Sequence, residues 1–224
     1  MTFSILGHCP ESGLFGMAIS SSSPAVAARC AHARAGVGVV ASQNVTDPRL
    51  GPHALDLMQK GATAREALAI LERCGSHMAY RQVLAIDRSG ESAIYSGSNV
   101  LGQWSEAQDR HVAAAGNLLA DTAVPEAMVA RFRTAKGHLG ERLMLALEAG
   151  LAAGGEAGPV HSAGLLIVDE QSWPLVDLRI DWALDCPIAA LRAAWQVYAP
   201  QIPAYVQRAL DPREAPSYGV PGDA

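Results

Sequence analysis

The feature that most constrains the fold is a pattern that occurs three times: an apolar segment, a short polar turn and a second apolar segment. The copies lie at residues 2–19, 83–95 and 164–178. Each copy predicts a β-hairpin, because Asp, Ser and Gly in the turns adopt the backbone conformations that join antiparallel strands. Hairpins exclude a wholly parallel sheet.

Two further apolar segments, Val37–Ala41 and Val112–Ala115, do not alternate with polar residues. We expect a single strand at each, covered on both faces. Helices are expected between the strands. Their signals are a capping box at Thr63–Glu66, a proline at position 125, leucines every four residues from 139 to 151, and Asp185 before Pro187.

The order of these elements favours an α+β fold with two sheets between outer helices, a four-layer αββα sandwich. An antiparallel sheet with helices on one face is the alternative. We expect residues 1–211 to form a single domain, because a chain of 224 residues, half of them apolar, is long enough to bury one sizeable core. Residues 212–224, with several Pro and Gly, are predicted to be a disordered tail.

Composition bears on partners and location. The net charge is −5 without a basic patch, so we expect no nucleic acid partner. No apolar run reaches the roughly 18 residues that a membrane helix needs. The start shows no export signal and the four cysteines are scattered, which favours a cytoplasmic protein.

His138 and Glu141 lack a partner His at helical spacing, so no metal or other cofactor is expected. Apolar Trp195 and Tyr198 leave a homo-oligomer open.

The start of the chain carries the most specific functional signal. Thr2 becomes the first residue when methionine aminopeptidase removes Met1, which a small second residue permits. An N-terminal Thr combines a hydroxyl nucleophile with an α-amine, whose pKa of about 8 suits a general base. At the start of a strand, this is the arrangement of the N-terminal-nucleophile (Ntn) hydrolases, which are αββα sandwiches. Thr and Ser are nevertheless common second residues, so Met-Thr alone indicates little.

Several segments resemble the bacterial domain-of-unknown-function 1028 family (DUF1028). The resemblance begins with Thr2–Ile5, Gly13–Ser21 and Ala33–Gln43 and continues to about residue 198 through Gly51–Pro52, Ala54–Met58, Arg81–Val83, Gly116–Leu119, Leu147–Gly150, Ala153–Gly155 and Val176–Asp181. It implies an Ntn-hydrolase-like fold and hydrolysis of an amide C–N bond, with no settled substrate. The chain departs from the family pattern at Asn44–Asp47 and at His161, two places that could line a site.

The candidate catalytic residues are Thr2 and Asn117. Asn117 follows Gly116 at the end of an expected strand, where its side-chain amide could stabilise an oxyanion. A left-handed turn residue is the alternative for Asn117. The candidate substrate-binding residues lie at the ends of other strands or in a loop: Ser21, Gln43, Asn44 and His161. Loop capping or ordinary surface exposure would explain these four as well.

Two functional hypotheses follow. The first is a hydrolase that cleaves a small-molecule amide with Thr2 as the nucleophile. The second is a non-catalytic binding or assembly module on the same fold, since a fold does not determine an activity. The mature N-terminus separates them, because a retained Met1 acylates the α-amine of Thr2 and removes the base.

Overall fold

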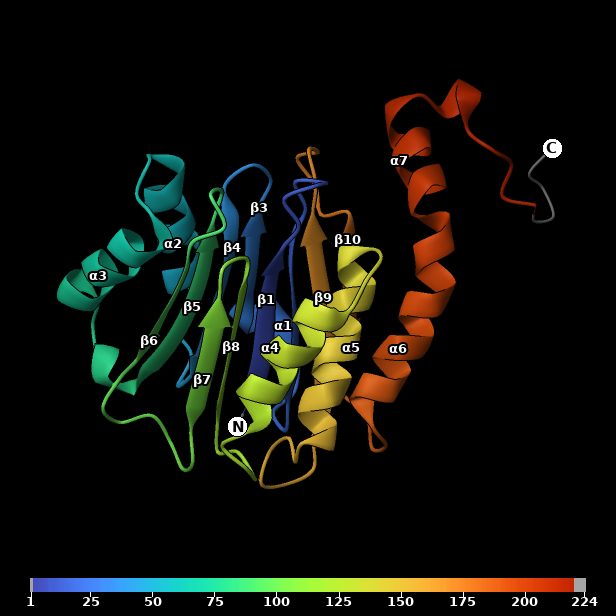
Figure 1. Ribbon diagram of the computed structural model, residues 1–224. Coiled ribbons are helices and arrows are strands. Elements are labelled where there is room, and N and C mark those ends of the chain that lie inside the picture. Colours follow the sequence, from blue (N-terminus) through green and yellow to red (C-terminus); the bar gives the residue numbers. More distant parts are fainter. Residues whose placement is uncertain (1, 220–224) are drawn as a thin grey trace.

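Two antiparallel sheets packed face to face form the centre of the molecule. In the computed structural model, which describes residues 2–219, helices cover both outer sides of the pair (Figure 1). Sheet A has six strands in the order β10-β9-β2-β1-β8-β7, and sheet B has four in the order β3-β4-β5-β6. The αββα sandwich predicted from the sequence is confirmed, and the alternative with helices on one face only is wrong.

All three predicted hairpins form. Sheet A comprises β1 Thr2–His8, β2 Phe15–Ser21, β7 Ser105–Asp109, β8 Val112–Asn117, β9 Ser162–Val168 and β10 Val176–Ile180. Sheet B comprises β3 Ala31–Arg34, β4 Gly38–Asn44, β5 Arg81–Asp87 and β6 Ser92–Ser96. The predicted hairpins are β1–β2, β5–β6 and β9–β10, and the structure adds β3–β4 and β7–β8. The sequence pattern missed β3 and β7, because both are edge strands with polar residues and no apolar run.

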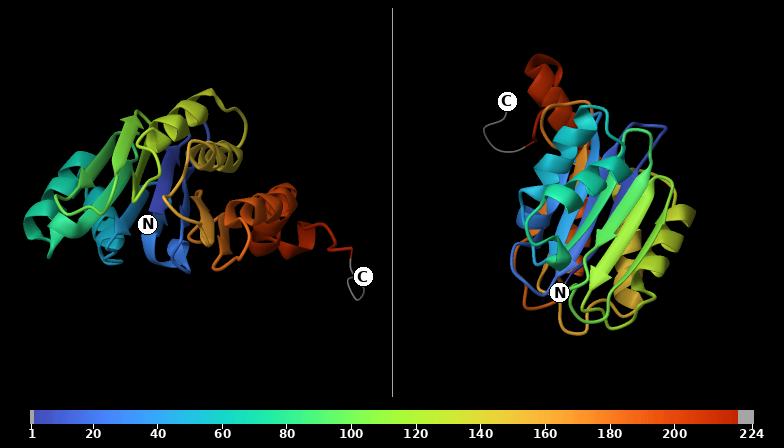
Figure 2. Two further views of the ribbon diagram at one scale, coloured as in Figure 1. Left: turned by 90° about the horizontal axis from the view of Figure 1, so that it is seen from below. Right: turned by 90° about the vertical axis from the view of Figure 1, so that its left-hand side faces the viewer.

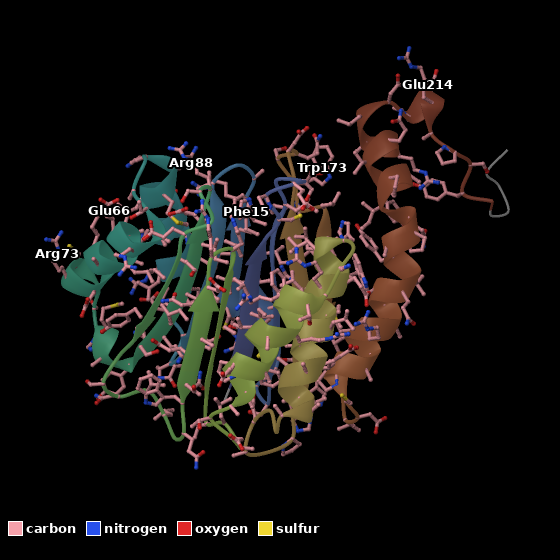
Figure 3. All side chains as sticks on the ribbon, in the orientation of Figure 1. Phe15, Glu66, Arg73, Arg88, Trp173 and Glu214 are labelled. Carbon is pink, nitrogen blue, oxygen red and sulfur yellow. The ribbon has the colours of Figure 1, made fainter. Side chains whose placement is uncertain are left out.

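The helices divide between the two outer layers. On sheet A lie α4 Val124–Thr134, α5 Leu139–Ala152 and α6 Pro187–Tyr198, and on sheet B lie α2 Leu50–Gln59 and α3 Ala64–Cys74. The remaining helical segments are α1 Val26–Cys30, α7 Ile202–Leu210 and three 3₁₀ turns at Met78–Tyr80, Ala199–Gln201 and Pro212–Glu214. In Figure 3 the side chains of Glu66 and Arg73 extend from α3 on the side away from the sheets.

The alternating side chains of each strand supply two different cores. In β1, Phe3 and Ile5 pack against α4 and α5, whereas Leu6 packs between the sheets with residues of β4 and β5. A third apolar cluster joins sheet B to α2 and α3. Strands of this kind are buried on both faces, which explains why their sequences read as continuous apolar runs.

The helix boundaries follow the expected signals. The capping box at Thr63 and Glu66 is formed at the start of α3, and Pro125 lies in the first turn of α4. Gly154 and Gly155 follow α5 with positive φ angles, a conformation that suits residues without a Cβ atom.

The C-terminal helices α6 and α7 run along one side of the molecule and beyond it (Figure 2). No residue of α7 is buried. The single domain at 1–211 and the disordered tail at 212–224 stay predictions, since Met1 and residues 220–224 lie outside the described residues. Within residues 2–219, no helix has the length and apolar character needed to cross a membrane.

The outer layer of sheet A is testable by a pair of identical substitutions. Leu147 on α5 is fully buried in the core between helices and sheet, whereas Leu184 is 86% exposed. Leu147→Ala should lower the free energy of unfolding by about 2–5 kcal/mol, because it removes apolar contacts and leaves a cavity. Leu184→Ala, the matched control, should change it by less than about 0.5 kcal/mol. Denaturant titration measures both, and an equally small change for both variants would contradict the assigned core.

Candidate functional site

Four polar side chains lie in one row across sheet A, at the end where β1 begins. Strand β1 runs between β2 and β8, and its first residue, Thr2, is paired in register with Asn117, the last residue of β8. The Thr2 Oγ1 atom lies 3.3 Å from Ser21 Oγ at the end of β2, and Ser21 is paired with Ser162 on β9. All four residues are buried. Phe15, labelled in Figure 3, marks the opposite end of β2.

The hydroxyl groups of this row continue toward the surface. Ser21 Oγ lies 2.9 Å from Ser23 Oγ and accepts a hydrogen bond from the Ser23 backbone N–H at 3.1 Å. The half-buried Arg29 donates from Nη2 to Ser23 Oγ at 3.0 Å. A chain of hydrogen-bonding groups therefore joins Thr2 to the guanidinium of Arg29, in the last turn of α1. Such a chain holds the Thr2 hydroxyl in place and polarises it.

Buried amides link the row to sheet B. Ser4 Oγ donates to Gln43 Oε1 at 2.6 Å, and Gln43 Nε2 donates to Gln82 Oε1 at 2.8 Å and to the Ala115 carbonyl at 3.2 Å. Asn117 Nδ2 also donates to Gln82 Oε1, at 3.2 Å. Because the Ala115 carbonyl can only accept, it fixes the orientation of Gln43 and, through it, those of Gln82 and Asn117.

This network decides which atom of Asn117 is available. The Asn117 side chain is fully buried and its Oδ1 atom has no hydrogen-bond partner among the described residues. The amide nitrogen is already committed to Gln82. In this orientation Asn117 offers the site an acceptor, whereas stabilisation of an oxyanion needs a donor.

Glu156 closes the same end of the sheet, although the sequence pattern did not single it out. Its backbone forms a β-bridge with Leu119, just beyond β8, and its carboxylate accepts from the Ser22 N–H, just beyond β2, at 3.1 and 3.2 Å. Burial raises the pKa of Glu156 to about 7, against the opposing effects of the N-terminal positive charge, the hydrogen bonds from Ser22 and the charge of His161.

His161 and Asn44 differ in their relation to this row. The His161 backbone N–H donates to the Ser21 carbonyl at 2.8 Å, so His161 lies beside the row. Its ring stacks on Trp182 at 4.4 Å between centroids, and Nδ1 donates to the Ala183 carbonyl at 2.8 Å. Asn44 instead caps a loop: Nδ2 donates to the Tyr80 carbonyl and Oδ1 accepts from the Leu101 N–H. Its positive φ of 72° suits that turn position.

A cavity of about 360 Å³ opens beside Glu156. Its walls are mostly apolar and comprise Leu151, Gly154, Gly158, Pro159, Val160 and Leu184, with Asp185 and Cys186 at the border. That size and lining suit part of a small organic molecule. Within residues 2–219, no cluster of three or more His, Cys, Asp or Glu side chains could hold a metal ion.

Two residues of the site have features in the sequence that strand and helix patterns do not use. Gln82 shares one face of β5 with Leu84 and Ile86, so it is a polar residue at a core position. Glu156 is the only charged residue in the Gly- and Ala-rich segment 152–160. The first signal is informative, because buried amides need partners. The second is weak, because a charged residue in a loop is usually solvated.

Comparisons with known proteins point to one family. The model of a family of unknown function, DUF1028, matches residues 2–191. A crystal structure of a DUF1028 protein from Silicibacter pomeroyi is 32% identical and aligns with a TM-score of 0.82, covering 88% of this chain and 89% of that chain. Anbu, the ancestral beta-subunit from Yersinia bercovieri, aligns at 12% identity with a TM-score of 0.41, covering 91% and 97% of the two chains. No curated protein matches.

The buried carboxyl of Glu156 predicts a pH-dependent stability. Because the pKa of this carboxyl is raised from 4.5 to about 7 on folding, the free energy of unfolding of the protein falls as the pH rises through that interval. The side chain introduced by Glu156→Gln is neutral at every pH. The free energy of unfolding of this variant, relative to that of the wild type, should therefore increase by about 1–3 kcal/mol between pH 5 and pH 8. Denaturant unfolding at both pH values measures the difference. The exposed Glu72→Gln is the control, and a difference that does not vary with pH would refute the burial effect.

Proposed function

Because the chain belongs to the DUF1028 family, whose function is unknown, we propose its activity from the site itself: hydrolysis of a small-molecule amide, with Thr2 of the processed chain as the nucleophile. One observation carries this proposal. Thr2 is the first residue of the central strand β1, and its hydroxyl is held in a buried polar row between Ser21 and Asn117. The αββα architecture is the architecture expected of an Ntn-hydrolase-like protein, and this supports the proposal.

The proposed reaction uses the α-amine that removal of Met1 would free. Thr2 Oγ1 attacks the carbonyl carbon of the amide while the α-amine takes the hydroxyl proton. The C–N bond then breaks, the amine product leaves with that proton, and the acyl group remains as an ester on Thr2. The α-amine next activates a water molecule, which hydrolyses the ester and regenerates Thr2. A strand buried on both faces suits this role, because it keeps the nucleophile in one geometry.

The residues proposed to bind substrate divide into two groups. Ser21 lies beside Thr2, His161 lies beside Ser21, and both would contact the substrate directly. Gln43 is fully buried and would act through Ser4 and Gln82, and Asn44 would shape the loop that it caps. The cavity beside Glu156 would accommodate one side of the scissile amide. A second candidate, a non-catalytic binding module, is favoured by the low 4% exposure of Thr2 in the unprocessed chain.

The nucleophile can be tested without knowing the substrate. The untagged protein should lack the mass of one methionine residue, and a β-lactone that acylates nucleophilic hydroxyls should add one acyl group to it. Thr2→Ala should abolish this labelling, while Thr2→Ser should retain part of it, because Ser preserves both the hydroxyl and the amine. Intact-mass spectrometry and peptide mapping measure the label. Undiminished labelling of Thr2→Ala would place the nucleophile elsewhere.

The α-amine can be tested by blocking it. A non-removable N-terminal tag should slow acylation of Thr2 by about 10²–10⁴-fold, the usual contribution of a general base, because an amide nitrogen cannot accept the proton. A C-terminal tag of the same sequence is the matched control and should have no effect. Full reactivity of the N-terminally tagged protein would rule out the Ntn mechanism. His161 with Ser162 or Ser21 would then be the next pair to test.

A further inference from the structure

The start of β1 is enclosed from both neighbouring strands. Strand β1 lies between β2, which ends at Ser21, and β8, which ends at Asn117. Glu156 contacts the continuation of both neighbours, through its bridge to Leu119 and through the Ser22 N–H. A residue that joins the ends of two flanking strands must cross the start of the strand between them. The backbone nitrogen of Thr2 therefore lies at the end of the sheet that Glu156 closes.

Two acceptors at this end lack the donors that they could bind. The carboxylate of Glu156 is 5% exposed, and the Ser22 N–H is the only hydrogen-bond donor to it among the described residues. A carboxylate has about four lone-pair sites, so one N–H leaves most of them unfilled. Asn117 Oδ1 is buried without any donor among residues 2–219. Buried acceptors without donors are rare in native structures, which points to an N–H-bearing group between these two.

We propose that the Glu156 carboxylate and Asn117 Oδ1 together hold the α-amine of mature Thr2, as positioning residues for the base. The inference rests on the proposed function and adds to it two residues that act through the amine. In the register of the sheet, Asn117 is the direct neighbour of Thr2 on one side.

This arrangement assigns a task to each group during the reaction. When the α-amine takes the proton from Thr2 Oγ1, it becomes an ammonium and needs acceptors for its N–H bonds. The Glu156 carboxylate and Asn117 Oδ1 are fixed in place before that charge develops, so they stabilise it without reorganisation. They resemble in this respect the carboxylate that orients the base in a catalytic triad.

Other charged groups lie near Glu156 and near the hydroxyl chain that leads to Thr2. His161 acts on Glu156 from the segment before β9, and Asp185 borders the cavity that Glu156 lines. Arg29 of α1 reaches Ser23 Oγ, two hydrogen bonds away from Thr2. A negative charge next to an ammonium raises its pKa, so removing the Glu156 charge should lower the pKa of the α-amine.

The test is the pH dependence of β-lactone acylation at Thr2, measured by intact-mass spectrometry on processed, untagged protein. In the wild type the rate should rise with pH as the amine loses its proton and then level off. Glu156→Gln should move the midpoint of this rise down by about one pH unit, because the nearby negative charge is gone. Asn117→Ser should move it down by a smaller amount. Glu156→Asp, which keeps the charge, should stay closer to the wild type.

The alternatives give different results. If Asn117 stabilised an oxyanion, Asn117→Ser would lower the plateau rate and leave the midpoint unchanged. Glu72→Gln on α3, far from the site, controls for the loss of one carboxylate. Thermal unfolding followed by circular dichroism checks that each variant is folded. Should Glu156→Gln fail to fold, the downward shift of the midpoint expected for Asn117→Ser decides the question.

Unshifted midpoints in folded Glu156→Gln and Asn117→Ser, with a wild type that is acylated, would overturn this inference alone. A processed wild type that is not acylated at any pH would overturn the proposed function, and the inference with it.

Discussion

The site depends on the burial of β1 on both faces at the centre of sheet A. Phe3 and Ile5 fix the strand against α4 and α5, and Leu6 fixes it against sheet B. A strand held in this way has no freedom to shift its register, because a slip by one residue would place every side chain on the wrong face. The position of Thr2 relative to Ser21 and Asn117 is thus set by apolar packing of the residues that follow it on the same strand.

The polar groups at the start of β1 lie in an interior where unpaired groups are costly. Most are paired: the amides of Gln43 and Gln82 bond to each other, to Ser4 and to backbone carbonyls. These hydrogen bonds fix each amide in one orientation. Asn117 Oδ1 and the Glu156 carboxylate remain as acceptors with few or no donors at this end of the sheet. Local departures from complete pairing are where functional sites are expected in an otherwise consistent fold.

The loop between α5 and β9 brings to the site residues that lie far from Thr2 in the sequence. It carries Glu156 across the start of β1 and leads through His161 into β9. Gly154 and Gly155, both at positive φ, let the chain turn sharply after α5 and reach the strand ends. The same loop forms one wall of the cavity beside Glu156, so it links the nucleophile to the space available for a substrate.

The sequence by itself determined the hairpins, most of the helices and hence the layered architecture, because side-chain period, turn residues and caps are local signals. It also pointed to Thr2, since a small second residue at a strand start is visible without a structure. It missed the polar edge strands β3 and β7, which form only because an apolar neighbour offers them a free edge. Only the tertiary structure placed Asn117 across from Thr2, oriented its amide through Gln82, and brought Glu156 over the start of β1. Strand order and register join residues more than a hundred positions apart, and no local pattern encodes which side-chain atom such a contact leaves without a partner.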